Sequence, residues 1–124
     1  MDKDSTLNTK AYAFALRVVN AYKYLTTEQK EFVLSKQLLR SGTSIGANSR
    51  EAIYAQSIDD FIHKLSISLK EASETAYWLE LLHDANFITN ESFESIYKDC
   101  TEIIKLLTAI IVKKKKELNK VGNK

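Results

Sequence analysis

The sequence predicts an all-α protein, an antiparallel up-down-up-down bundle of four helices. The 124 residues contain no proline and only three glycines, which is too few turn-forming residues for a fold of many strands. Four segments carry apolar residues at helical spacing, and the short stretches between them favour antiparallel neighbours. The length and the 44% hydrophobic fraction are typical of one domain with one core.

The first helix is expected over residues 9–25, with Asn8 or Thr9 as its cap. Its apolar side chains fall into two stripes. One stripe consists of Tyr12, Ala15, Leu16, Val19 and Tyr22, and the other of Phe14, Val18, Ala21 and Leu25. A four-helix core needs one stripe per helix, so this wide apolar circumference indicates contact on two sides of the helix.

The second helix is expected to begin near Thr27. Apolar residues recur in it at heptad-like spacing, namely Leu34, Leu38, Ile45 and Ala52. Residues 41–49 in its middle are rich in serine, glycine, threonine and asparagine, a composition typical of a loop. Small side chains also let two helices approach closely, so the residues alone leave loop and helix open here.

The third and fourth helices have clearer starts. Ser57 is a serine cap, followed by Asp59 and Asp60, which suit the positive end of a helix dipole. The fourth helix follows Thr89 or Asn90 and runs into a lysine run. Both helices carry core seams of the bundle type. These are the rows Ile58, Leu65, Ala72 and Leu79, then Phe93, Cys100 and Leu107, and finally Ile96, Ile103 and Ile110.

The net charge of +2 is distributed unevenly. Residues 113–124 hold six lysines and one glutamate, a balance of +5, which leaves residues 1–112 with twelve basic and fifteen acidic groups, or −3. We therefore divide the chain into a bundle over residues 1–112 and a lysine-rich end over residues 113–124. Because the bundle itself is mildly acidic, a dedicated nucleic-acid-binding domain is disfavoured.

The lysine-rich end has two interpretations. Its lysines gain affinity for nucleic acid by releasing counterions from phosphates, or they form a solvated helix end where cations suit the dipole. The candidate contacts are Lys113, Lys114, Lys115, Lys116 and Lys120.

The sequence holds no assembled catalytic or metal-binding motif. Residues 80–83 have the Glu-x-x-His spacing of a di-iron ligand pair, but such a site needs a second pair on another helix and two further carboxylates. The similar pair at residues 60–63 lies on the same helix. Cys100 stands in an apolar row with no histidine near it in sequence. We expect no enzymatic activity, no metal and no cofactor.

The expected location is the cytoplasm. A single cysteine excludes an internal disulfide framework and favours a reducing compartment. The first residues are charged and precede no apolar run, unlike a signal peptide, and no apolar stretch is long enough to span a bilayer.

Apolar surface in excess of one core predicts contact between subunits. The interface residues expected from it are Phe14 and Val18 on the first helix and Trp78 and Leu81 on the third. The alternative is a wide core stripe within one subunit.

Polar residues on the second helix predict a hydrogen-bond network. They recur at spacings of three or four and so share roughly one face: Gln37, Arg40, Ser44, Asn48 and Glu51. Set among small residues, they suggest a buried or interfacial network rather than a catalytic set.

The second helix also carries a family resemblance. Residues 37–52, QLLRSGTSIGANSREA, look like the signature of the four-helix-bundle proteins encoded by intervening sequences of 23S ribosomal RNA genes. Residues 60–64 and 68–79 resemble the third helix of the same family, and the match covers about residues 9–115. The resemblance implies that residues 41–49 lie inside a long helix. It also implies a homopentameric barrel of bundles around a central channel.

Two functions follow as hypotheses. The first is a non-enzymatic oligomeric scaffold with a protein partner still to be named. The second is an accessory protein that binds RNA or DNA through a basic C-terminal rim. A sister branch of the resembling family assists the reverse transcriptase of diversity-generating retroelements and binds nucleic acid, but the body of that branch is markedly basic. No membrane partner is expected.

Overall fold

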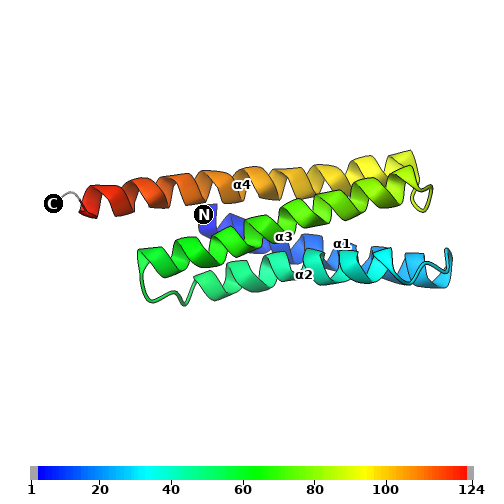
Figure 1. Cartoon of the computed structure of the whole chain (residues 1–124), viewed down its shortest axis with the longest axis horizontal. Coiled ribbons are helices and arrows are strands. Elements are labelled where there is room, and N and C mark those ends of the chain that lie inside the picture. The colour runs from blue at the N-terminus through cyan, green and yellow to red at the C-terminus, as the bar shows by residue number, and fades with distance from the viewer. Residues whose placement is uncertain (1–2, 123–124) are drawn as a thin grey trace.

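The computed structural model describes residues 3–122, with side chains described over residues 6–120. Over this range the chain forms four helices and no strand: α1 (Lys3–Thr27), α2 (Leu34–Ala52), α3 (Ile58–Asp84) and α4 (Asn90–Gly122). Each helix packs against two others, so that the order around the bundle is α1, α2, α3, α4. Successive helices run in opposite directions (Figure 1). The predicted antiparallel four-helix bundle is confirmed.

The starts of α1 and α2 both differ from the prediction. Helix α1 already begins at Lys3, so neither Asn8 nor Thr9 is its cap. Thr27 ends α1 instead of beginning α2, because its hydroxyl donates to the carbonyl of Lys23 at 2.6 Å and so satisfies the end of the preceding helix. The chain reverses through Lys30, whose φ of 54° is in the left-handed region. Glu31 then accepts hydrogen bonds from backbone amides at the start of α2. A glutamate ahead of the helix was not a start signal that the sequence analysis considered.

Residues 41–49 are helical throughout, which decides between the two alternatives left open for them. Gly42 explains why small residues are needed here. A Cβ added to Gly42 would lie 2.7 Å and 2.8 Å from the two γ-carbons of Val18, closer than side chains pack. Gly46 is less constrained, since a Cβ there would meet Ala11 at 3.5 Å or more, an ordinary contact. The close approach of α1 to α2 thus depends on Gly42.

The two glycines give a matched pair of variants. Alanine favours a helix over glycine by roughly 0.5–1 kcal/mol, so Gly46→Ala is expected to raise the free energy of unfolding by about that amount. Gly42→Ala is expected to lower it by about 1–3 kcal/mol, because overpacking against the stiff Val18 outweighs the same gain. Urea denaturation followed by circular dichroism measures both. In the Gly42→Ala background, Val18→Ala should cost less than in the wild type, and equal stability of the two glycine variants would contradict the close approach.

The starts of α3 and α4 confirm the predicted caps. The Ser57 hydroxyl accepts from the amide of Asp60 at 3.0 Å, and the Thr89 hydroxyl accepts from the amide of Ser92 at 3.1 Å. The predicted seams supply much of the core. Buried members include Leu65, Ala72, Leu79, Cys100, Leu107, Ile96, Ile103 and Ile110.

Helix α4 is the longest of the four helices. It has 33 residues against 19 in α2, and its C-terminal part extends past the α2–α3 turn (Figure 1). The end of the lysine-rich segment therefore extends beyond the other helices. None of the helices formed by residues 3–122 is both long and apolar enough to cross a membrane.

Candidate interaction surfaces

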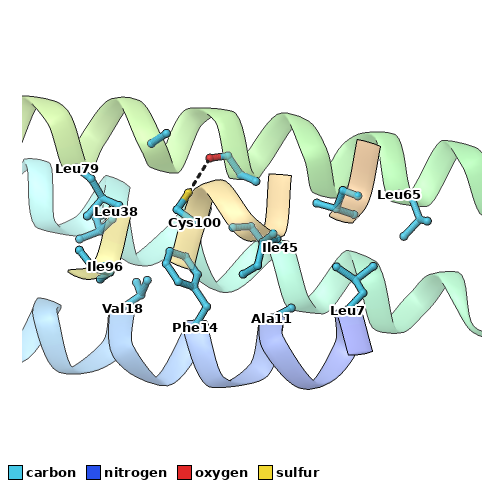
Figure 2. Packing of buried hydrophobic residues seen from close by; sticks show 14 of the residues in the cluster. Leu7, Ala11, Phe14, Val18, Leu38, Ile45, Leu65, Leu79, Ile96 and Cys100 are labelled. Atoms are coloured by element: carbon cyan, nitrogen blue, oxygen red, sulfur yellow. Dashed lines mark hydrogen bonds between the residues drawn. The ribbon is translucent and has the colours of Figure 1, made fainter. Parts of the chain in front are cut away.

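Phe14 and Val18 lie in the core of the bundle, so the prediction that they form a subunit interface is wrong. Phe14 is 1% exposed and Val18 is 0% exposed. Figure 2 shows both side chains pointing from α1 toward side chains of the other helices, among them Ile45 and Cys100. The two apolar stripes of α1 were identified correctly, but the stripe that faces the core was taken for the outer one.

The outer stripe of α1 is the one led by Tyr12 and Leu16, which are 56% and 52% exposed. The guanidinium of Arg50 lies 5.8 Å from the centroid of the Tyr12 ring. Beside it, small residues of α1 and α2 line a shallow groove of about 110 Å³, among them Ala15, Gly46 and Ala47. This face combines exposed apolar side chains with a groove, which are the features of a protein-contact surface.

Trp78 and Leu81 on α3 are partly exposed. The Trp78 ring packs against the core from the side and meets Tyr77 edge to face, with ring centroids 5.0 Å apart. The Trp78 Nε1 atom is buried and has no hydrogen-bond partner among residues 6–120. Tyr77 beside it is 56% exposed. The predicted interface role of Trp78 and Leu81 stays a prediction, and both side chains remain accessible to a partner.

The five polar residues predicted as a network are not buried within the bundle. Arg40 pairs with Glu71 at 3.2 Å and with Glu74 at 2.5 Å on α3, and these carboxylates raise its pKa above the ordinary arginine value, with Glu74 the main cause. The Ser44 hydroxyl donates to the carbonyl of Arg40, and Asn48 Nδ2 donates to the carbonyl of Ser44.

The remaining two members of the set extend the same outer face. Gln37 accepts weakly from Arg40 Nε at 3.4 Å. Glu51 lies 3.7 Å from Lys64 Nζ and is largely exposed. The prediction of a network buried inside one chain is therefore wrong, because two of the five residues are exposed and the other three are only partly buried. The interfacial alternative stays a prediction.

The buried hydrogen bonds between α2 and α3 come from hydroxyls on neighbouring positions that sequence reasoning missed. Ser49 Oγ lies 2.9 Å from Ser68 Oγ, and the Ser68 hydroxyl donates to the carbonyl of Ile45. About two turns further along both helices, the Thr75 hydroxyl donates to Ser41 Oγ at 2.9 Å. All four hydroxyls are buried. Small polar residues here let the helices approach and keep their hydroxyls satisfied, and only knowledge of the neighbouring helix could have identified them.

The predicted lysine contacts are not equivalent. Lys113, Lys115, Lys116 and Lys120 are exposed on the C-terminal part of α4. Lys114 is partly buried instead: its Nζ lies 3.4 Å from Glu117 and 5.4 Å from the centroid of the Phe61 ring. Lys114 therefore fastens α4 to the start of α3, while the other four present free charge to solvent.

Cys100 and His83, which the sequence analysis considered for chemistry, both have structural roles. The Cys100 thiol is fully buried 3.4 Å from the carbonyl of Ala72, and burial raises its pKa to about 12, far from the thiolate that nucleophilic chemistry needs (Figure 2). His83 contacts Asp84 and Asn90 and stacks on Phe93 at 4.3 Å, so it fastens the α3–α4 turn. Residues 6–120 contain no cluster of three or more histidine, cysteine or acidic residues fit to hold a metal.

These features define a class: an all-α four-helix bundle whose distinguishing surfaces are exposed apolar and basic patches. The family is then identified by comparison, since residues 3–109 match the model of the 23S rRNA-intervening sequence protein family. The chain belongs to that family.

A solved relative agrees with this assignment. A crystal structure at 1.70 Å of a protein with unknown function from the S23 ribosomal protein family, from Bacteroides thetaiotaomicron, is 63% identical in sequence with a TM-score of 0.88. The alignment covers 89% of the present chain and 98% of that protein. None of the curated proteins matches the chain.

Proposed function

We propose that the protein is a non-enzymatic interaction scaffold that works as a homo-oligomer, with a pentamer as the assembly the family resemblance implies. The observation that supports this most is the outer face of α1, where Tyr12 and Leu16 are more than half exposed beside a groove of small residues. The stripe with Phe14 and Val18 already faces the core. The stripe with Tyr12 and Leu16 therefore has no packing role within one chain.

The assembly is tested by light scattering. The wild type is expected to give about five times the 14.1 kDa mass of the chain at micromolar concentration. Leu16→Glu and Trp78→Glu place a charge where an apolar contact is proposed and should lower that mass, because an unpaired charge is costly to bury. Thr108→Glu, on the exposed surface of α4, is the matched control and should leave the mass unchanged. A monomeric wild type would refute the proposal.

A second candidate function is weak binding of RNA or DNA through the C-terminal part of α4. Four exposed lysines lie there within about two turns, and the exposed Lys98 and Lys105 continue basic charge along the same helix. If the α4 helices of a ring point the same way, their ends converge and the local density of charge attracts polyanions. The expected binding is indifferent to sequence, measurable near ~50 mM salt and severely weakened by ~200 mM.

The structure supplies a matched control for this second function. Replacing Lys113, Lys115, Lys116 and Lys120 together by glutamine is expected to abolish the binding of labelled RNA at low salt while the oligomer stays intact. Lys114→Gln should leave most of the binding, because Lys114 is already engaged by Glu117 and Phe61. Equal binding by wild type and the fourfold variant, or none by either, would leave the lysines a solubilising role and favour the protein scaffold.

A further inference from the structure

A pocket of about 330 Å³ opens between α1 and α4 near the α3–α4 turn. All four helices contribute to its floor, which includes Leu25 of α1, Leu38 of α2, Leu79 of α3 and Ile96 of α4. The α1–α4 seam is the least extensive of the four helix contacts, which leaves room for the opening. Cavities between the helices of a bundle are a common place for ligands, and this volume is within the range of small-molecule sites.

The mouth of the pocket is polar but carries no free charge. Arg17 is the cation at the rim, and it is neutralised by Asp99 at 2.6 Å and also bonded to Ser95. The amide of Asn20 and the hydroxyl of Ser92 also line the pocket. Within residues 6–120 neither side chain has a hydrogen-bond partner. The rim therefore offers uncharged donors and acceptors above an apolar floor.

We propose that this pocket binds a small neutral amphiphile with an apolar body and one uncharged hydrogen-bonding group, such as a hydroxyl or an amide. The volume accommodates about ten non-hydrogen atoms, at roughly 30 Å³ for each atom of the size of water. The leucine and isoleucine floor selects the apolar body. A charged head group is disfavoured, because it would lose water at a rim where Arg17, the one cation among the described lining residues, is already paired.

Straight-chain probes of equal length separate the ligand classes. Titration of the full chain with 1-octanol, followed by amide chemical shifts and by the melting temperature, is expected to show saturable binding with a dissociation constant on the order of 0.1–1 mM. Shifted amides should cluster around the pocket. Octanoate and octylammonium should bind at least ten times more weakly. If either ion bound as tightly as 1-octanol, the neutral class would be overturned. If none of the three probes bound saturably, the site itself would be overturned.

Variants at the pocket tie the binding to this position. Ala21 lines the pocket, and Ala21→Leu should fill it and abolish octanol binding, while Ala13→Leu on the exposed side of the same helix should not. If Ala21→Leu fails to fold, Ser92→Trp blocks the mouth from the surface of α4 and should have the same effect. Replacing Asn20 and Ser92 together by alanine should weaken octanol by about tenfold, through the loss of hydrogen bonds. Unchanged affinity in the blocking variants would overturn the proposal.

Discussion

Phe14→Ala is expected to lower the free energy of unfolding by about 3–5 kcal/mol, the range for truncating a buried phenylalanine. The side chain is 1% exposed and is among the largest that are fully buried, so its removal leaves a cavity which rigid neighbours cannot fill. A typical domain has about 5–15 kcal/mol of stability in total, which makes this a severe loss. Urea denaturation followed by circular dichroism at two protein concentrations measures it and separates folding from association.

Leu16→Ala is the matched control for that variant. Leu16 lies on the same helix but is 52% exposed, so its truncation should cost roughly 0.5 kcal/mol or less within one chain and act mainly on the oligomer. The opposite result would contradict the orientation of α1. If Phe14→Ala kept its stability and only dissociated the oligomer, Phe14 would face a neighbouring subunit and the helix would be rotated from the orientation described.

The second large effect is expected at Glu31, which caps α2 from the preceding turn. Its carboxylate accepts from the amides of Val33 at 3.2 Å, Leu34 at 3.0 Å and Ser35 at 2.7 Å. Val33, in the cap position, has no side chain able to bind these amides. Glu31→Ala therefore leaves up to three donors at the helix start without a partner, and is expected to cost about 1–3 kcal/mol at pH 7.

The same contacts make this stability depend on pH. Burial alone would raise the pKa of the Glu31 carboxyl, but the hydrogen bonds from three backbone amides and the Ser35 hydroxyl lower it, and the net direction is below the ordinary glutamate value. A carboxyl whose pKa is lower in the folded state contributes stability above its unfolded pKa and loses it as the pH falls through the folded pKa. The contribution should be complete at neutral pH and disappear in acid.

A pH series of denaturation midpoints checks the sign. The difference in stability between wild type and Glu31→Gln should be largest at neutral pH and shrink as the pH falls below the usual glutamate range. Glu28→Gln serves as the control, because Glu28 is exposed and its carboxylate makes no hydrogen bond to the start of α2. A constant difference between wild type and Glu31→Gln at every pH would show that the charge of the carboxylate is irrelevant to the cap.

The interaction surfaces were only partly predictable. The excess of apolar residues on α1 was evident from spacing, and so were the lysines of residues 113–116. Which stripe of α1 faces inward was not, because Phe14 with Val18 and Tyr12 with Leu16 are equally plausible as core residues until a neighbouring helix is placed. The difference between Lys114 and the exposed lysines was not predictable either, because it depends on Phe61, which lies far away in sequence and contacts Lys114.

The sequence by itself determined the four helices, their order and the inward seams of α3 and α4, because heptad rows such as Ile96, Ile103 and Ile110 depend on local periodicity alone. The caps at Ser57 and Thr89 were readable for the same reason, since each bonds an amide three residues away. Only the tertiary structure decided the rotation of α1, the buried hydroxyl pairs of α2 and α3, and the fit of Gly42 against Val18. Those features are contacts between residues distant in sequence, whose energies depend on how two helices are placed and not on the pattern within either one.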